Sequence, residues 1–356
     1  MRTRKFATVH PWALFGRVVL ILAVLHIPAA LLEDATAVYK DRDSFVWHTK
    51  FAGLRAGRYQ DARLLIMGDS QVMSGILPRE LEHAAGGPVY NLGLPSLQPE
   101  GVVAMLPDLE GMPELRTIVL GVSPFSLFES EIFASFRGYA RRELWPRRPG
   151  DLFAFPYLIH DSSDFVRHAL DASPLFRVRY RLNGSALPGD ITSPFPGRVM
   201  DVLFAGAGRR AFESRRIAAL LERERGHWSW NFVGEDPGQC PTEPPRVGVF
   251  PGTLRYPDRV GADAAYRRLL GALTARYDVY LVELPLSETW HGVVDAQEVY
   301  GRIDARVASW RADFPSLRVI PRPAHDAYTG ADFIDWTHLS YCGARRYTRA
   351  LVGQLN

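Results

Sequence analysis

Arg63-Leu64-Leu65-Ile66-Met67-Gly68-Asp69-Ser70 is the stretch that decides the fold, because a short apolar run opens there into a glycine and two polar residues. Four consecutive apolar residues before such a turn signal predict a buried strand. Apolar runs follow at residues 89–90 and 117–122, with helical segments between them at 78–85 and 99–109. This alternation predicts a parallel sheet with crossover helices.

The same rhythm resumes near the end of the chain. We expect helices over residues 264–277, 299–310 and 345–355, and strands over 280–285 and 317–320. Together the two halves predict an α/β fold, a three-layer α/β/α sandwich around a parallel sheet, with an insertion after the third strand.

Residues 130–260 break the rhythm with aromatics, prolines and arginines, and we interpret them as an inserted cap. The core domain would then consist of residues 38–129 and 261–356. Inside the insertion, a helical stretch at 209–225 carries an apolar stripe that should pack against the core: Phe212, Ile217, Ala218 and Leu221. The next residues, His227-Trp228-Ser229-Trp230, have two readings, as ordinary packing or as the lining of a carbohydrate groove.

The amino terminus combines a basic cluster with a long apolar run. Three of the first five residues are basic, and residues 12–32 reach the about 20 residues that a helix needs to cross a bilayer. We expect residues 1–37 to form a single-pass anchor in the cytoplasmic membrane, with the rest of the chain in the periplasm and residues 33–60 as a connector with helical potential. The alternatives are a signal segment cleaved near Ala35-Thr36-Ala37 and a buried core helix.

The composition excludes several classes of protein. Hydrophobic residues make up 47% of the chain and charged residues 23%, which argues against a disordered or collagen-like chain. A net charge of +3 gives no reason to expect nucleic acid as a partner. The histidines lack paired ligand spacing, so we expect no metal and no cofactor. The two cysteines, Cys240 and Cys342, either pair or stay free.

Asp335-Trp336-Thr337-His338 places a carboxylate three residues before an imidazole in a late loop. A serine hydroxyl is a weak nucleophile unless a base lies within hydrogen-bond reach and a third group orients that base. Because the carboxyl ends of parallel strands meet at one edge, this loop and Ser70 are expected to come together. We predict Ser70 as nucleophile, His338 as base and Asp335 as the orienting carboxylate, with Asp332 as the competing carboxylate.

Donors for a developing oxyanion are expected in the loops after the second and third strands. These loops contain Asn91-Leu92-Gly93 and Gly121-Val122-Ser123. No side chain obstructs a glycine amide, so Gly93 is the expected donor. Asn91 and Ser123 would add a side-chain donor or support the loop.

At these residues the chain resembles the SGNH (GDSL-type) hydrolase superfamily, whose members carry Gly-Asp-Ser near the start, Asn-x-Gly in the second loop and Asp-x-x-His near the end. The resemblance covers residues 60–125 and 264–356 and leaves the insertion unmatched. It implies that Ser70, His338 and Asp335 act as a triad, and that the amides of Ser70 and Gly93 are the oxyanion donors. The third block of the family usually ends in Gly-x-Asn, whereas this chain has Ser123 in place of the asparagine.

This departure, together with the amino-terminal anchor, is similar to the DltD-like branch. That resemblance implies a membrane-anchored protein that works outside the membrane, alongside a membrane-bound O-acyltransferase, to move acyl groups onto or off envelope polymers. We therefore expect an O-acyltransferase or O-acyl esterase that works through an acyl-Ser70 intermediate on an acylated donor and an envelope polysaccharide. The alternatives are a non-catalytic scaffold or binding protein with the same fold and a general secreted esterase or lipase.

Overall fold

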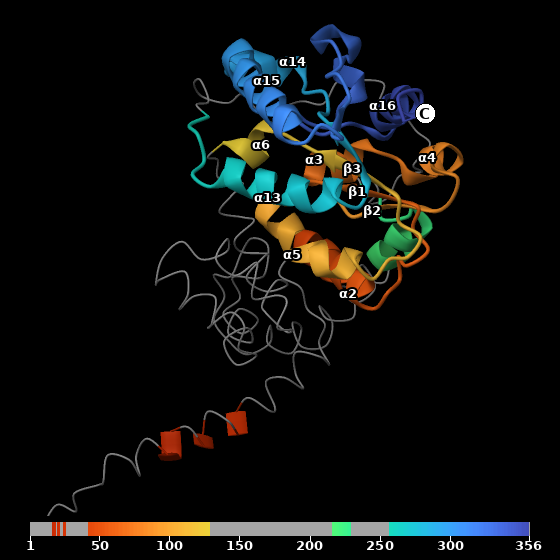
Figure 1. Ribbon diagram of the computed structural model, residues 1–356, viewed down its shortest axis with the longest axis vertical. Coiled ribbons are helices and arrows are strands. Elements are labelled where there is room, and N and C mark those ends of the chain that lie inside the picture. Colours follow the sequence, from red (N-terminus) through yellow and green to blue (C-terminus); the bar gives the residue numbers. More distant parts are fainter. Residues whose placement is uncertain are drawn as a thin grey trace, which may run out of the picture. The chain divides into compact units, whose positions relative to one another are not determined.

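The computed structural model describes residues 42–128, 216–228 and 256–355, together with short helical pieces at 16–18, 20–21 and 24–25. The chain divides into two units, one made of residues 1–42 and 161–214 and the other of residues 43–160 and 215–356. The second unit holds the sheet (Figure 1).

The sheet has five strands, all paired in parallel. They are β1 (Leu64–Met67), β2 (Val89–Asn91), β3 (Thr117–Gly121), β4 (Asp278–Val282) and β5 (Arg318–Val319). Their order is β2-β1-β3-β4-β5, which is the order of a doubly wound sheet whose direction of winding switches between β1 and β3. The chain therefore has an α/β fold, and its crevice for ligands is expected at the carboxyl ends of these two strands.

Helices cover both faces of the sheet. They are α2 (Arg42–Arg55), α3 (Ser70–Gly75), α4 (Pro78–Ala85), α5 (Pro99–Leu109), α6 (Pro124–Leu127), α13 (Ala262–Thr274), α14 (Glu288–Val293), α15 (Ala296–Asp313) and α16 (Tyr341–Val352), with 3-10 turns at His325–Ala327 and Gly330–Asp332.

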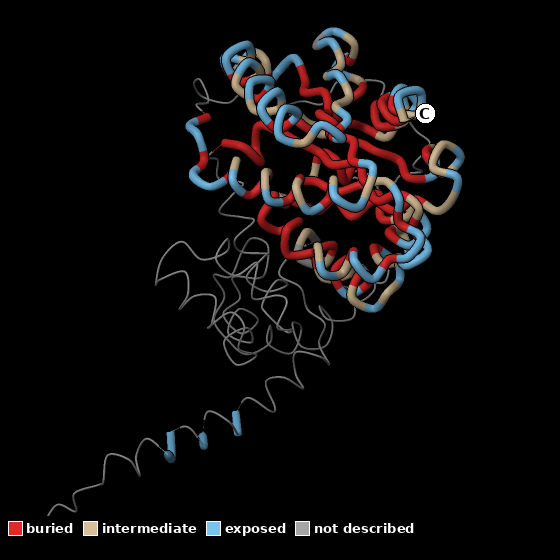
Figure 2. The backbone as a smooth tube through the Cα atoms, in the orientation of Figure 1, coloured by how far each residue is buried: buried red, intermediate tan, exposed pale blue. Residues whose placement is uncertain are grey.

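Successive strand residues point to two separate cores, as the two-residue period of a strand requires. Leu65 and Met67 belong to a first core with α2, α5, α13 and α15, whereas Leu64 and Ile66 belong to a second core with α3, α4 and α16. Figure 2 shows the strands buried between these helices. Both faces of the sheet are thus covered by helices, so a functional site is expected at the ends of the strands.

The predicted strand at 64–67 and the predicted helices at 78–85 and 99–109 are confirmed residue for residue. The fourth strand begins at Asp278, two residues before the expected start. The apolar pattern did not reveal this start, because the first side chain of the strand is polar and exposed. The closing helix begins at Tyr341 rather than at residue 345. The side chain of Ser340 caps this earlier start by accepting a hydrogen bond from the Gly343 amide.

The helical potential expected for the connector over residues 33–60 is confirmed in its second half, but that half belongs to the core and is not a separate connector. Helix α2 packs into the first core, and Trp47, Phe51 and Leu54 are buried. These residues recur at helical spacing, so they make one continuous core-facing stripe.

Most of the predicted cap lies outside the described residues, but its segment 216–228 belongs to the core domain. Residues 216–223 are helical, and Ile217, Leu221 and Trp228 are part of the first core. The predicted packing of the apolar stripe is therefore confirmed for Ile217 and Leu221, while Ala218 is half-buried and Phe212 is not among the described residues.

The predicted anchor falls almost entirely outside the described residues. Among the residues that the structure does describe, no helix has the length and apolar character that crossing a membrane requires. Cys342 forms a disulfide, and the one other cysteine in the sequence is Cys240, which lies beyond the described ranges.

Candidate active site

Ser70 lies where β1 turns into α3, at the carboxyl edge of the sheet. Gly68 makes this turn with a φ of +152°, and a Cβ at this position would approach Cγ2 of Val72 to 2.6 Å. Only glycine adopts this conformation without strain. Asp69 then caps α3, because its carboxylate accepts a hydrogen bond from the Gln71 amide at 3.0 Å. The turn and the cap together fix the backbone of Ser70.

The structure brings Ser70, His338 and Asp335 together. Nε2 of His338 lies 2.8 Å from Oγ of Ser70, although the two residues are 268 positions apart in the chain. Nδ1 of the same ring lies 2.7 Å from Oδ2 of Asp335. The competing carboxylate, Asp332, instead accepts hydrogen bonds from the Thr329 amide and from Arg346. A continuous chain of hydrogen bonds thus runs from a carboxylate through an imidazole to the serine hydroxyl.

The spacing of three residues between Asp335 and His338 allows both carboxylate oxygens to be used. Oδ1 of Asp335 accepts hydrogen bonds from the amides of Thr337 and His338, each at 2.8 Å, while Oδ2 receives the imidazole. Burial alone would raise the pKa of Asp335, but these hydrogen bonds and the nearby imidazole lower the pKa overall. The carboxylate is therefore ionised at neutral pH and holds the ring in one orientation.

Two contacts that the sequence did not indicate hold the late loop in place. Gln71, the residue after the serine, donates a hydrogen bond from Nε2 to the carbonyl of Thr337 at 3.0 Å. Ser287, in the loop after β4, donates from Oγ to the carbonyl of Trp336 at 2.8 Å. Both polar side chains follow strand ends or turns, which is the signal that would have identified them.

Of the two roles expected for Asn91, a side-chain donor for the oxyanion or support of the loop, the structure shows the support. The Gly93 amide donates a hydrogen bond to Oδ1 of Asn91 at 2.8 Å, so it is already engaged. The Asn91 amide group donates to carbonyls of and just after α3, and Asn91 is fully buried. Neither residue presents a free donor here, because the side chain of Asn91 turns back onto its own loop. Among the described residues, none accepts a hydrogen bond from the Ser70 amide.

Ser123 also supports the turn. Its hydroxyl donates a hydrogen bond to Oδ2 of Asp69 at 2.5 Å and accepts one from the Ser126 amide at the start of α6. Burial raises the pKa of Asp69, and the Ser123 hydroxyl counteracts part of that effect. Ser123 therefore braces the residue before Ser70, and its hydroxyl is already engaged.

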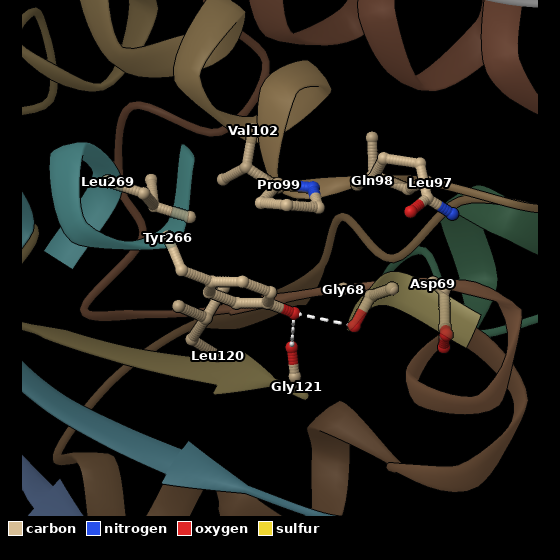
Figure 3. Close-up of a pocket in the computed structure, with 11 residues that line it drawn as sticks. Gly68, Asp69, Leu97, Gln98, Pro99, Val102, Leu120, Gly121, Tyr266 and Leu269 are labelled. Atoms are coloured by element: carbon tan, nitrogen blue, oxygen red, sulfur yellow. Dashed lines mark hydrogen bonds between the residues drawn. The ribbon is translucent and has the colours of Figure 1, made fainter. Parts of the chain in front are cut away.

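A small pocket lies beside this turn (Figure 3). Asp69, Gln98 and Tyr266 line it, and the Tyr266 hydroxyl points to the carbonyl of Gly121. Neither Ser70 nor His338 lines this pocket. It therefore belongs to the packing around Asp69 and is not a cavity that opens onto Ser70 or His338.

The side chains of the site are accessible enough for chemistry. That of His338 is 16% exposed and that of Asp335 is 40% exposed, while Ser70 is half-buried. In the described part of the chain, no cluster of histidine, cysteine and carboxylate side chains could hold a metal ion. The groups that lie together are those of proton transfer and nucleophilic attack: a hydroxyl, an imidazole and a carboxylate. No protein-family model matches the chain, and no curated protein is similar enough in sequence to be counted as a match.

Proposed function

We propose that this chain is a serine-dependent acyl-transfer enzyme with Ser70 as nucleophile, His338 as general base and Asp335 as the orienting carboxylate. The observation that carries the proposal is the chain of two hydrogen bonds, 2.8 Å and 2.7 Å long, that joins the three side chains. Its place at the switch point of a doubly wound sheet, where such folds bind ligands, is a second support.

The reaction would proceed in two steps. As Oγ of Ser70 bonds to the carbonyl carbon of an ester, Nε2 of His338 takes the hydroxyl proton and the carbonyl electron pair moves to oxygen. Collapse of this intermediate expels the alcohol, which receives that proton, and leaves an acyl-Ser70 ester. A second hydroxyl, from an acceptor or from water, then gives its proton to Nε2 as its oxygen bonds to the acyl carbon. Collapse of this second intermediate breaks the bond to Oγ of Ser70, which takes the proton back from Nε2. Asp335 stabilises the imidazolium in both steps.

The oxyanion requires donors that are not yet engaged. The Ser70 amide has no acceptor among the described residues, so it is available. The Gly93 amide would first have to release Oδ1 of Asn91. A closed oxyanion loop of this kind favours a second candidate function, a non-catalytic envelope scaffold or binding protein that has kept the fold.

The resemblance to the SGNH superfamily and to its DltD-like branch supplies the finer proposal. It assigns the enclosed parallel sheet to a three-layer SGNH-type sandwich, and it places the protein on the cytoplasmic membrane, with the catalytic domain in the periplasm. The substrates would be an acylated donor and an envelope polysaccharide, and the partner a membrane-bound O-acyltransferase. The disulfide at Cys342 supports an oxidising compartment.

Labelling with a fluorophosphonate tests the proposal. The full chain should be labelled covalently, Ser70→Ala should not, and His338→Gln should be labelled far more slowly because the base is lost. Ser309→Ala is the matched control, since Ser309 is an exposed serine on α15, and it should label like wild type. An unlabelled wild type would favour the non-catalytic scaffold. Rapid turnover of soluble p-nitrophenyl esters without polymer or partner would favour a general esterase.

A further inference from the structure

The helix that carries Ser70 is very short. Helix α3 spans six residues, Ser70–Gly75, and it cannot satisfy the carbonyls of its own last turn. A helix this short is also unstable by itself, so its orientation must be imposed by its surroundings. The groups that hydrogen-bond to α3 therefore determine where Ser70 lies relative to His338, which belongs to a separate loop.

Asn91 supplies one part of this support. Its Nδ2 donates hydrogen bonds to the carbonyls of Val72 at 2.9 Å and of Ile76 at 3.0 Å. The loop that holds Asn91 is itself held by Lys50 of α2, whose Nζ donates to the carbonyl of Gly93 at 2.5 Å. Both side chains are buried.

The second part comes from residues 216–228, the segment of the insertion that packs into the first core. His227 Nε2 lies 2.9 Å from the carbonyl oxygen of Ser74, and the Trp228 amide donates to the carbonyl of Met73 at 3.3 Å. His227 is 1% exposed, so its ring is enclosed beneath α3. The segment is also tied to β2, since the Asn91 amide donates to the carbonyl of Arg225 at 2.8 Å.

The direction of the histidine hydrogen bond follows from its partner. A carbonyl only accepts, so Nε2 of His227 must carry the hydrogen. Burial lowers the pKa of His227 to about 4, which keeps the ring neutral under ordinary conditions. The contact extends toward the nucleophile, because Oγ of Ser74 donates to the carbonyl of Ser70 at 3.0 Å. Two hydrogen bonds therefore lead from His227 to the backbone of Ser70.

We propose that His227 is a positioning residue for Ser70: by holding the Ser74 carbonyl, it sets the orientation of α3 and thus the distance from the serine hydroxyl to His338. This inference rests on the proposed function. It also gives segment 216–228 of the insertion a part in catalysis, although no residue of that segment touches the triad by a hydrogen bond within the described ranges.

The test uses the full chain and the saturation kinetics of fluorophosphonate labelling. His227→Leu and His227→Met remove the donor, whereas His227→Gln keeps an N–H at the position of Nε2. We expect the limiting labelling rate to fall about 10- to 100-fold in the two apolar variants, with little change in the half-saturating concentration, because the nucleophile is misplaced. His227→Gln should recover most of that rate. Ile217→Ala, which removes buried packing from the same segment, is the control for lost stability.

The outcomes are distinct. Either apolar variant, if folded by circular dichroism and labelled at the wild-type limiting rate, would overturn the positioning role while leaving the proposed function intact. The same is true if Ile217→Ala loses as much rate as His227→Leu. If neither apolar variant folds while His227→Gln does, His227 is a folding determinant and the positioning role is overturned as well. A wild type that resists the reagent would remove the proposed function itself.

Discussion

Acidification should weaken the folded state through His227. Burial, with a smaller contribution from nearby Lys50, lowers the pKa of this imidazole from 6.5 to about 4. Between these two pKa values the unfolded chain binds a proton at His227 and the folded protein does not. The stability that neutral His227 contributes is therefore full above pH 6.5 and is lost as the pH falls through about 4. This difference in pKa between the unfolded and folded states corresponds to about 3 kcal/mol in the free energy of unfolding, of which about 2 kcal/mol should be lost by about pH 5.

The assay is guanidinium-induced unfolding, followed by tryptophan fluorescence at about pH 7.5 and about pH 5. His227→Gln is the reference, because glutamine keeps a donor for the Ser74 carbonyl and does not titrate. Carboxylates such as Asp335 titrate in both proteins, so their effect cancels in the difference. The free energy of unfolding should fall by about 2 kcal/mol more in the wild type than in His227→Gln. Equal losses in the two proteins would refute the reasoning, since His227 would then titrate alike in the folded and unfolded states.

Three further predictions concern other parts of the core. Asp335→Asn should lower the limiting rate of fluorophosphonate labelling by about 1,000-fold or more, because His338 loses the carboxylate that orients it; a rate near that of wild type would contradict this role. Glu283→Gln should give the opposite pH response to His227: burial raises the pKa of Glu283 to about 7, so the wild type loses stability as pH rises from 4.5 through about 7. Melting temperatures at about pH 5 and pH 8 should show that loss in the wild type and not in the variant, and parallel shifts would contradict it. Gly68→Ala should cost about 1–3 kcal/mol in chemical denaturation, because alanine does not tolerate the φ of +152° at the turn before the nucleophile; an unchanged midpoint would show that the turn relaxes freely.

The parts of the fold that the sequence could reveal are those in which a local pattern decides the structure. Residues 64–67 are apolar on both faces, as a strand buried between two helical layers must be, and the structure places them in an interior strand, between β2 and β3. Helices α4 and α5 both begin with a proline, which is favoured in the first turn and marks the start of a helix. The Asp-x-x-His spacing was informative for a similar reason, because a single turn lets Asp335 reach the backbone and the ring of His338 together.

The sequence left two roles open for Asn91 and Ser123, a side-chain donor or support of the loop, and it could not decide between them or show that the Gly93 amide is engaged. Spacing places these residues at the right edge of the sheet, but the direction of a side chain depends on which neighbour offers the better partner. For Asn91 that neighbour is α3, whose last carbonyls would otherwise stay unpaired. For Ser123 it is the Asp69 carboxylate, which is buried and therefore needs a donor.

Polar side chains support the helix that carries Ser70, and hydrogen bonds fix the position of that helix more narrowly than apolar packing would. Apolar packing is non-directional and tolerates small rotations of a helix, whereas each hydrogen bond from Asn91 and His227 fixes one carbonyl in distance and in direction. A buried amide or imidazole that loses its partner is costly, so a displaced α3 is penalised several times at once. Lys50 extends the same principle one layer outward, because burial lowers its pKa well below 10.5 and the amine is best satisfied by the Gly93 carbonyl. The position of the serine hydroxyl is thus defined by segments from three distant parts of the chain, and a change in any one of them should lower the rate of the proposed acyl transfer before it destabilises the fold.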